Sequence, residues 1–320
     1  MTGASGKVGR NLIPALIKAG YSVRAVQFQT PLAIKGIDIK IGTISDANFI
    51  DKSLEDMDAV IHLATSKEDP DNFMNVSIKG TFELLDKCRE KKQIKQLILA
   101  GGDAALGIFF YPQPIPLNEN APLRAYPGYY AFSKVMEETM CNQYFIQYRV
   151  PITILRASWI HDEDDILAYM TLRRPNFGGP LWEEIASTPE QKSYFSKDKD
   201  GVGCLLSPDG AAFKRHIVSI RDLTQAFLIA IGNPHTIGET FNIAAPSSFC
   251  YEVLARYISE KLNLPVVDFK LDGFYDFSID VNKARSVLGY KPEYDTFKIV
   301  DAAIGFRNSG MRRSEIKYFG

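Results

Sequence analysis

The sequence has little cysteine, and the cysteines it has are scattered. Four occur among 320 residues, and no two of them form a C-x-x-C pair. This spacing argues against a zinc site and against a disulfide framework, because both need clustered or regularly spaced cysteines. We therefore expect buried, reduced thiols at Cys88, Cys141, Cys204 and Cys250.

An excess of charge and a long apolar run are also missing. The 37 lysine and arginine residues are balanced by 38 aspartate and glutamate residues, so the basic excess of a nucleic-acid-binding protein is absent. No apolar run reaches the roughly 18 residues that a membrane span requires, and no charged and then apolar leader opens the chain. We expect a cytoplasmic protein that binds neither nucleic acid nor membrane.

The most informative pattern that is present begins at residue 2. Three glycines in the spacing G-x-x-G-x-x-G lead into an amphipathic segment over residues 10–20. Glycines so placed also make ordinary turns. However, they let backbone N–H groups approach a pyrophosphate while the positive end of the next helix faces it. The turn predicts a dinucleotide site at Gly3, Ser5, Gly6, Lys7, Val8 and Gly9.

A phosphate-binding turn of this kind normally follows a buried strand, which aims the turn at the phosphates. Here only Met1 precedes Thr2. We therefore expect that the first strand is missing, either lost from this chain or excluded by a gene start placed about one strand too late.

Short apolar runs alternate with amphipathic helical stretches from residue 6 to residue 243, which is typical of parallel β-α-β units. After Trp159 this rhythm breaks. With 46% hydrophobic residues, the chain can bury two cores. We expect a dinucleotide-binding domain over 1–157 and a substrate lobe over 158–320, with residues of about 211–245 packing back on the first domain. The expected strands are 22–26, 59–64, 96–100, 152–156 and 240–243, and the expected helices are 47–54, 72–90, 130–148, 221–231, 251–262 and 282–288.

Seven motifs follow one another along nearly the whole chain. After the glycine turn come DAVIHLA at 58–64, NVSIKGT at 75–81, YAFSK at 130–134, RHIVSIRD at 215–222, GETFNI at 238–243 and DVNKARSVLGY at 280–290. In this order they resemble the extended short-chain dehydrogenase/reductase family, in particular its NAD-dependent epimerase/dehydratase group, which acts on nucleotide sugars. The resemblance implies an α/β fold: a Rossmann-type, doubly wound parallel sheet with a smaller C-terminal α/β substrate lobe.

The resemblance also implies where a cofactor lies. Bound across the carboxyl ends of the strands, it would be lined by Leu63, Ala64, Thr65 and Ala100, although small residues at strand ends also simply pack. The end of the second strand carries neither the acid that marks NAD nor the arginine that favours NADP. Gln27 can bind a neutral hydroxyl, which favours NAD, whereas Lys7 and Arg10 leave NADP open.

Tyr130 and Lys134 lie four residues apart on a predicted helix, so their side chains share one face. A free tyrosine has a pKa of about 10, which a nearby ammonium can lower toward the range of a useful base. A surface tyrosine and lysine at this spacing are the alternative. By resemblance, Lys134 also binds the nicotinamide ribose, and Asn75 holds the active-site helix or a water in the proton path.

One position departs from the family pattern. The family usually has Ser or Thr just after the strand at 96–100, and Gly102 stands there in this chain. Loss of one donor to a developing oxyanion typically costs about 10²–10³ in rate. Asp103 is the nearest group that could donate instead, with a solvent-facing turn as its alternative. The glycines could also make room for a bulkier substrate.

Two further features concern the second lobe. By resemblance, Arg215 contacts a substrate pyrophosphate, and its planar guanidinium suits bidentate binding. An ion pair with Asp222 is the alternative. His161 with the acids at 162–165 lacks a second histidine at ligand spacing, so we expect a solvated acidic loop and no metal site.

Together these features favour an NAD- or NADP-dependent epimerase or dehydratase acting on a nucleotide sugar or a similarly polar sugar. A net reductase of a ketone or aldehyde uses the same Tyr and Lys pair. A cofactor-binding sensor or scaffold without catalysis is the alternative from another class. By resemblance, a homodimer is expected, formed through a four-helix bundle that includes the helix of the pair.

Overall fold

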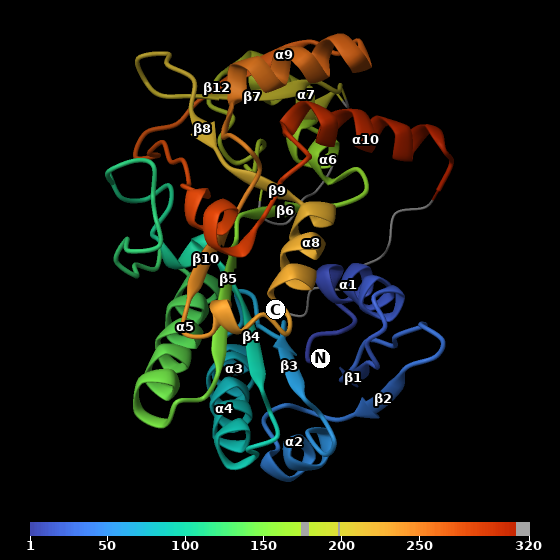
Figure 1. Ribbon diagram of the computed structural model, residues 1–320. Coiled ribbons are helices and arrows are strands. Elements are labelled where there is room, and N and C mark those ends of the chain that lie inside the picture. The colour runs from blue at the N-terminus through green and yellow to red at the C-terminus, as the bar shows by residue number, and fades with distance from the viewer. Residues whose placement is uncertain (174–178, 198, 312–320) are drawn as a thin grey trace.

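A parallel β-sheet occupies the lower half of the molecule in Figure 1 and positions everything that follows. The structure, a computed structural model, describes residues 1–173, 179–197 and 199–311. Within the sheet the strand order is β10-β5-β4-β3, and every neighbouring pair is parallel. The bounds are Ala59–His62 for β3, Gln96–Gly102 for β4, Ile152–Ala157 for β5 and Thr240–Ile243 for β10.

Met1 and Thr2 connect this sheet to a second parallel pair. The Thr2 backbone N–H donates to the Ile61 carbonyl on β3, and the Met1 carbonyl accepts from the Val26 N–H on the other side, at 3.0 and 2.8 Å. Two residues therefore lie between β3 and the pair formed by β1 (Arg24–Gln27) and β2 (Asp38–Ile41). The glycine turn follows directly, at the carboxyl edge of the strands.

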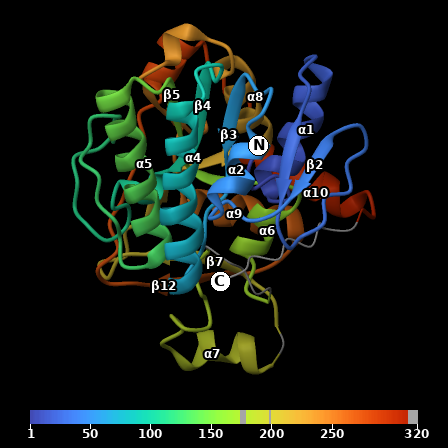
Figure 2. The same ribbon diagram turned by 90° about the horizontal axis from the view of Figure 1, so that it is seen from below.

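Helices cover both faces of the sheet, as Figure 2 shows. One face carries α1 (Lys7–Lys18) and α8 (Ile220–Ala230), and Leu12, Leu155 and Phe227 belong to the apolar core there. The other face carries α2 (Ala47–Ser53), α4 (Thr81–Glu90) and α5 (Tyr129–Tyr148), over a core that includes Leu85 and Ile154. This arrangement confirms the predicted doubly wound α/β fold.

The second lobe lies above the sheet in Figure 1 and has its own apolar core, which includes Trp182, Leu205 and Phe269. Two short parallel pairs, β6 with β9 and β7 with β12, form part of it. Its strands are β6 (Trp159–His161), β7 (Val202–Leu206), β8 (Lys214–Arg215), β9 (Ile217–Ser219), β11 (Phe249–Cys250) and β12 (Val266–Lys270). Its helices are α6 (Asp165–Met170), α7 (Pro189–Ser196), α9 (Tyr251–Leu262) and α10 (Thr296–Asn308).

The helical segment before α4 is not a uniform α-helix. It begins with α3 (Pro70–Asn72) and continues as a π-helix over Phe73–Gly80. Such segments rotate the side chains that follow relative to an α-helical register. Another π-helix covers Ala284–Leu288, and short 3-10 turns cover Asp103–Ala105 and Pro234–Thr236. Among the described helices, none combines the length and apolar character that crossing a membrane requires.

Candidate active site

A cavity of about 580 Å³ opens at the carboxyl ends of β3, β4 and β5. Most of the predicted site residues line it. They are Gly3, Ser5, Gly6, Lys7, Val8, Leu63, Ala64, Thr65, Ala100, Asp103, Tyr130, Lys134 and Arg215. The tertiary structure therefore brings together groups that are up to about two hundred residues apart in sequence, as the parallel strand order requires.

The glycine turn fits a bound pyrophosphate. Gly3 has φ +61°, and a Cβ atom on it would lie 2.6 Å from the Ala64 nitrogen. Gly6 begins α1 with no side-chain cap, which leaves first-turn N–H groups facing the cavity. Gly9 does not line the cavity. A Cβ atom there would lie 2.3 Å from the Ala4 carbonyl oxygen, so Gly9 instead lets α1 pack against the turn.

Thr2 and His62 hold the turn against the end of β3. Thr2 Oγ1 accepts from the backbone N–H groups of Leu63 and Ala64, at 3.2 and 3.3 Å, and lies 2.7 Å from His62 Nδ1. The other ring nitrogen lies 2.9 Å from Thr81 Oγ1. Burial lowers the pKa of His62 to about 3, so the ring is neutral at physiological pH. Sequence reasoning did not identify this buried network.

The end of the cavity that was expected to bind the cofactor ribose differs from the prediction. Gln27 does not line it, because its side-chain oxygen accepts from the Leu32 backbone N–H at 2.8 Å. The residues that follow, Phe28, Gln29 and Thr30, line the cavity instead. The chain turns directly after β1, and the Gln27 amide holds that turn.

Tyr130 and Lys134 share one face of α5, and both line the cavity. Lys134 Nζ lies 5.8 Å from the centre of the Tyr130 ring and donates to the Ala100 carbonyl oxygen at 3.1 Å. Lys67 Nζ stands 3.7 Å above the same ring. Burial lowers the pKa of Lys67 to about 7. Lys67 was not predicted as a site residue, because nothing in the sequence around it indicates that it contacts the Tyr130 ring.

Lys134 also contacts a buried acid on its own helix. Its Nζ atom lies 2.9 Å from Glu137 Oε2, and both side chains are buried. The second oxygen of this carboxylate accepts from Thr65 Oγ1 at 2.9 Å. Sequence reasoning missed Glu137 too, although its spacing of three from Lys134 is a signal that could have identified it.

Asn75 is not where the sequence prediction places it. It is exposed on the π-helix and does not line the cavity. The residues that line the cavity here are Asn72 of α3 and Val76 of the π-helix. Ser77 is its inward-facing polar residue and lies within 3.3 Å of the Thr65 hydroxyl. The wider helical turn changes which side chains point inward.

The far end of the cavity is aromatic and charged. Asp103 accepts from Ser158 Oγ at 2.8 Å, and burial raises the pKa of this carboxyl to about 6. Asp103 is therefore buried rather than part of a solvent-facing turn. The Arg215 guanidinium is stacked 3.4 Å from the centre of the Trp159 ring and 4.6 Å from that of Phe109.

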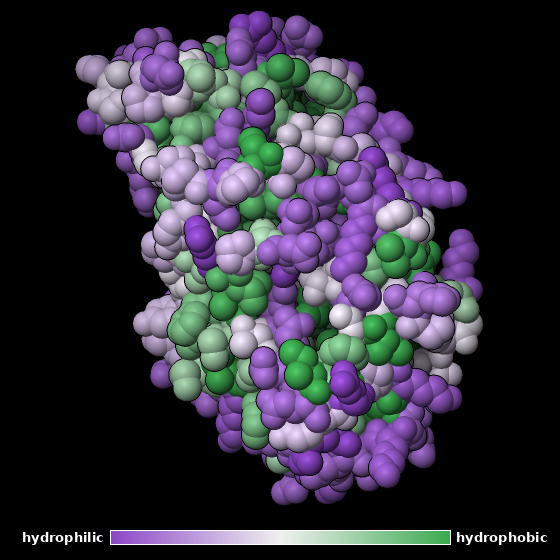
Figure 3. Space-filling view, turned by 60° about the vertical axis from the view of Figure 1, so that its left-hand side comes forward, coloured by the Kyte–Doolittle hydropathy of each residue, from purple (hydrophilic) through white to green (hydrophobic). Residues whose placement is uncertain are grey.

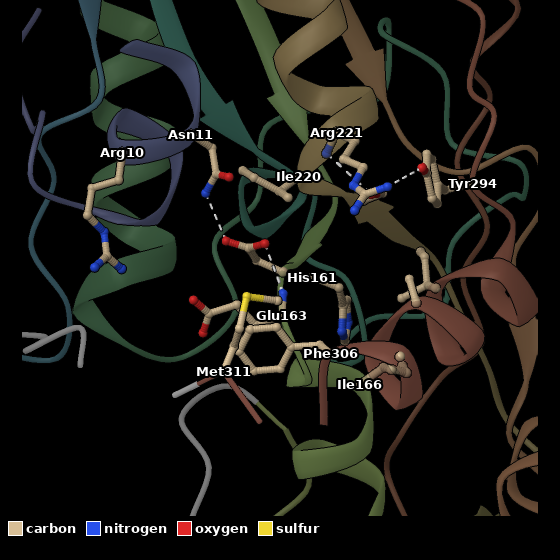
Figure 4. Close-up of a pocket in the computed structure, with 15 residues that line it drawn as sticks. Arg10, Asn11, His161, Glu163, Ile166, Ile220, Arg221, Tyr294, Phe306 and Met311 are labelled. Atoms are coloured by element: carbon tan, nitrogen blue, oxygen red, sulfur yellow. Dashed lines mark hydrogen bonds between the residues drawn. The ribbon is translucent and has the colours of Figure 1, made fainter. Parts of the chain in front are cut away.

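A second cavity, of about 660 Å³, lies between α1, α8 and α10 (Figure 4). The Asn11 side-chain amide points into it and donates to the Asp162 carboxylate at 2.8 Å. On the opposite wall, the Arg221 side chain donates to the Tyr294 hydroxyl. The glycine turn does not line this second cavity, although Arg10 and Asn11 of the following helix do. The two cavities share no lining residue, so this one is separate from the one that Tyr130 lines.

The acidic run at 162–165 borders that second cavity and corrects the expected solvated loop. Asp164 and Asp165 are buried, and each is paired with a cation from elsewhere in the chain. Lys7 Nζ lies 2.6 Å from Asp165, and Arg307 Nε lies 2.7 Å from Asp164. The loop thus joins the two lobes. Within the part of the chain that the structure describes, no group of acids, histidines and cysteines is arranged to hold a metal ion.

Comparison with known proteins gives matches over most of the chain. The sequence model of the NAD dependent epimerase/dehydratase family matches residues 1–244. A putative UDP-glucose 4-epimerase of Methanocaldococcus jannaschii is 23% identical over 98% of this chain and 99% of its own length. A short-chain dehydrogenase/reductase superfamily protein of Agrobacterium tumefaciens with bound NAD has a TM-score of 0.80 at 23% identity, covering 97% of this chain and 96% of the other.

A UDP-glucose 4-epimerase of Thermotoga maritima with UDP-glucose has a TM-score of 0.75 at 18% identity, covering 97% of this chain and 98% of the other. At these identities the likeness of the two solved structures establishes the fold.

Proposed function

The chain belongs to the NAD-dependent epimerase/dehydratase family, and on that premise we propose that it acts on a nucleotide sugar by transient hydride transfer. The observation that carries this proposal is the meeting of Tyr130 and Lys134 with the glycine turn in one cavity. An epimerase is favoured over a net oxidoreductase, because the M. jannaschii relative that spans the whole chain is named as one.

In this proposal, different residues bind the cofactor and transfer the proton. The first turn of α1 and the glycines hold the pyrophosphate, and Lys134 orients the nicotinamide ribose. When bound, the cofactor supplies the hydride acceptor and donor. Tyr130 takes the hydroxyl proton of the sugar and returns it, since the ammonium of Lys134 favours the phenolate. The cofactor is NAD or NADP, and with no basic side chain among residues 27–30, NAD is favoured.

The residues around Arg215 favour a phosphorylated substrate. Arg215 lines the cavity, with its guanidinium fixed between two rings, and a planar, immobile guanidinium suits bidentate phosphate binding. Asp103 and Ser158 lie nearby and offer hydrogen-bonding groups to sugar hydroxyls. We assign Asp103 and Arg215 to the substrate. We also assign Gly102, which does not line the cavity itself but whose Cβ position lies 3.7 Å from the Tyr130 hydroxyl oxygen.

The test is incubation of the purified protein and NAD with a panel of UDP-hexoses and UDP-uronic acids, followed by chromatography for isomers. Tyr130→Phe should abolish turnover, whereas Tyr129→Phe, which alters the exposed neighbour, should leave it intact. Isomer formation that survives Tyr130→Phe would remove this residue from the mechanism. Stoichiometric consumption of reduced cofactor without isomers would identify a net reductase instead.

Gly102 favours a second candidate, a protein that binds the cofactor as a sensor or scaffold without turnover. The position that usually carries the hydroxyl has no side chain here. Calorimetry should then show binding of NAD or NADP together with no conversion of any panel member. Failure to bind either nucleotide at millimolar concentration would exclude both candidates.

We also propose a homodimer formed through α4 and α5. Large apolar side chains on this side of the molecule are exposed, and Figure 3 shows apolar residues over the lower part of that face. Phe82, Phe132, Ile146 and Tyr148 are 45–58% exposed. Exposed apolar side chains that gather on one face are typical of protein interfaces. Sedimentation should show a dimer, and Phe132→Lys with Ile146→Lys should yield a monomer.

A further inference from the structure

A buried carboxylate lies against the lysine of the proposed catalytic pair. Glu137 follows Lys134 by one helical turn on α5, and the two side chains are 1% and 5% exposed. A buried ion pair adds little net stability compared with well-packed apolar residues of similar volume. The pair therefore needs an explanation other than holding the fold together.

The carboxylate is fixed from both sides. Oε2 faces Lys134 Nζ at 2.9 Å, and Oε1 accepts from Thr65 Oγ1 at 2.9 Å. The Thr65 hydroxyl in turn lies 3.3 Å from those of Ser77 and Ser133. Glu137 is thus held by Lys134 of its own helix and by Thr65 of the loop after β3, and Thr65 is in turn contacted by Ser77 of the π-helix. Lys134 is left with two acceptors, Glu137 and the Ala100 carbonyl, which together determine where its ammonium lies.

Lys67 also lies close to the Tyr130 ring, with its Nζ atom 3.7 Å from the ring centre against 5.8 Å for that of Lys134. Because burial lowers the pKa of Lys67 to about 7, its ammonium is partly lost at neutral pH. The charged and titratable groups of the surrounding elements are Lys7 of α1, His62 of β3, Lys67 and Glu68 after β3, Asp103 after β4, Tyr126 before α5, Lys134 and Glu137 of α5, and Arg215 of β8.

We propose that Glu137 is a positioning residue that fixes the Lys134 ammonium, offsets part of its charge, and thereby sets the pH at which Tyr130 ionises. A nearby negative charge disfavours the phenolate. Glu137 therefore keeps the phenol protonated to a higher pH than Lys134 alone would, which suits a group that must return a proton as well as take one. The consequence for catalysis rests on the proposed function, whereas the effect on ionisation does not.

The experiment measures the ionisation of Tyr130 directly. Tyrosinate absorbance is recorded against pH in the full-length protein, with and without NAD, and the curve of a Tyr130→Phe partner is subtracted for each variant. Glu137→Gln removes the charge and should shift the Tyr130 transition to lower pH by about one unit. Asp58→Asn is the matched control: it removes an exposed acid at the opposite end of the strands and should shift the transition by less than about 0.2 units.

Glu137→Gln leaves Lys134 with a weaker acceptor and could unfold the chain. Glu137→Asp is the second variant: its shorter side chain withdraws the carboxylate from Lys134 and should shift the transition in the same direction by a smaller amount. In an active preparation, the pH dependence of kcat should move with the absorbance. A loss of thermal stability with an unmoved transition, or a shift to higher pH, would overturn the proposal. Loss of turnover in every variant with the expected shift would count against the proposed function alone.

Discussion

The hydroxyl oxygen of Tyr130 lies 3.7 Å from the point where a Cβ atom would stand on Gly102. The backbone at Gly102 is extended, with φ −154° and ψ 154°, so any residue can adopt it. The glycine therefore leaves an opening beside the phenol that a small side chain would occupy without strain.

We predict that Gly102→Ser raises turnover about 10- to 100-fold, because it supplies a hydroxyl donor at the position where one is missing. Steady-state kinetics on the substrate identified by the panel would measure the change. Gly101→Ser is the comparison: Gly101 borders the cavity through its backbone, but a Cβ atom there would face Ile154 at 3.1 Å rather than the Tyr130 hydroxyl. An equal gain from both variants would argue against a specific role for position 102.

Gly9→Ala should weaken NAD binding more than tenfold and destabilise the protein, because its Cβ atom would lie 2.3 Å from the Ala4 carbonyl and force the turn away from α1. Calorimetry and thermal unfolding measure the two effects. Gly305→Ala on α10 is the matched control, as nothing lies within 4 Å of its Cβ position. It should stabilise the protein by up to about 1 kcal/mol, with NAD affinity unchanged.

The ion pair between Lys7 and Asp165 joins the two lobes, and its side chains are only 12% and 3% exposed. Lys7→Met should lower the free energy of unfolding by about 3 kcal/mol, because it leaves a buried carboxylate without that partner. Urea unfolding would show the loss. The exposed pair of Lys95 and Asp58 is the comparison, and Lys95→Met should cost less than about 1 kcal/mol. Equal losses of unfolding free energy in the two variants would show that burial of the Lys7 and Asp165 pair does not determine its contribution to stability.

His62 makes the protein sensitive to acid. Its pKa is about 3 in the folded chain against 6.5 for a free histidine, with burial as the main cause. Between these values the unfolded chain binds more protons, so stability falls as the pH decreases from about 6.5 toward 3. The full effect is of the order of 5 kcal/mol.

His62→Gln should reduce stability at neutral pH by about 1–2 kcal/mol, through weaker hydrogen bonds to Thr2 and Thr81. It should also flatten the decline below pH 6.5. Urea midpoints measured from about pH 7 to pH 4 would compare the two slopes. Parallel slopes would show that another group is responsible.

Much of the dinucleotide-binding half could be read from the sequence. Strands predicted at 96–100, 152–156 and 240–243 occur as Gln96–Gly102, Ile152–Ala157 and Thr240–Ile243. Buried parallel strands are continuous apolar runs between amphipathic helices, so their signal is local. In the second lobe, the helix predicted at 251–262 occurs as α9, whereas the strands β7 and β12 were not predicted. These strands are short and pair over more than sixty residues of chain, and such pairing leaves little local pattern.

The sequence by itself determined the order of the parallel units, the glycine turn and the spacing of Tyr130 and Lys134, because each depends on neighbours within a few residues. Only the tertiary structure decided that Asn75 faces outward, that Gln27 holds a turn, that Asp164 and Asp165 are buried in ion pairs, that Lys67 lies over the Tyr130 ring, and that Glu137 pairs with Lys134. Those placements depend on which distant elements meet at the cavity, and on the burial and charge pairing that their meeting imposes on each side chain.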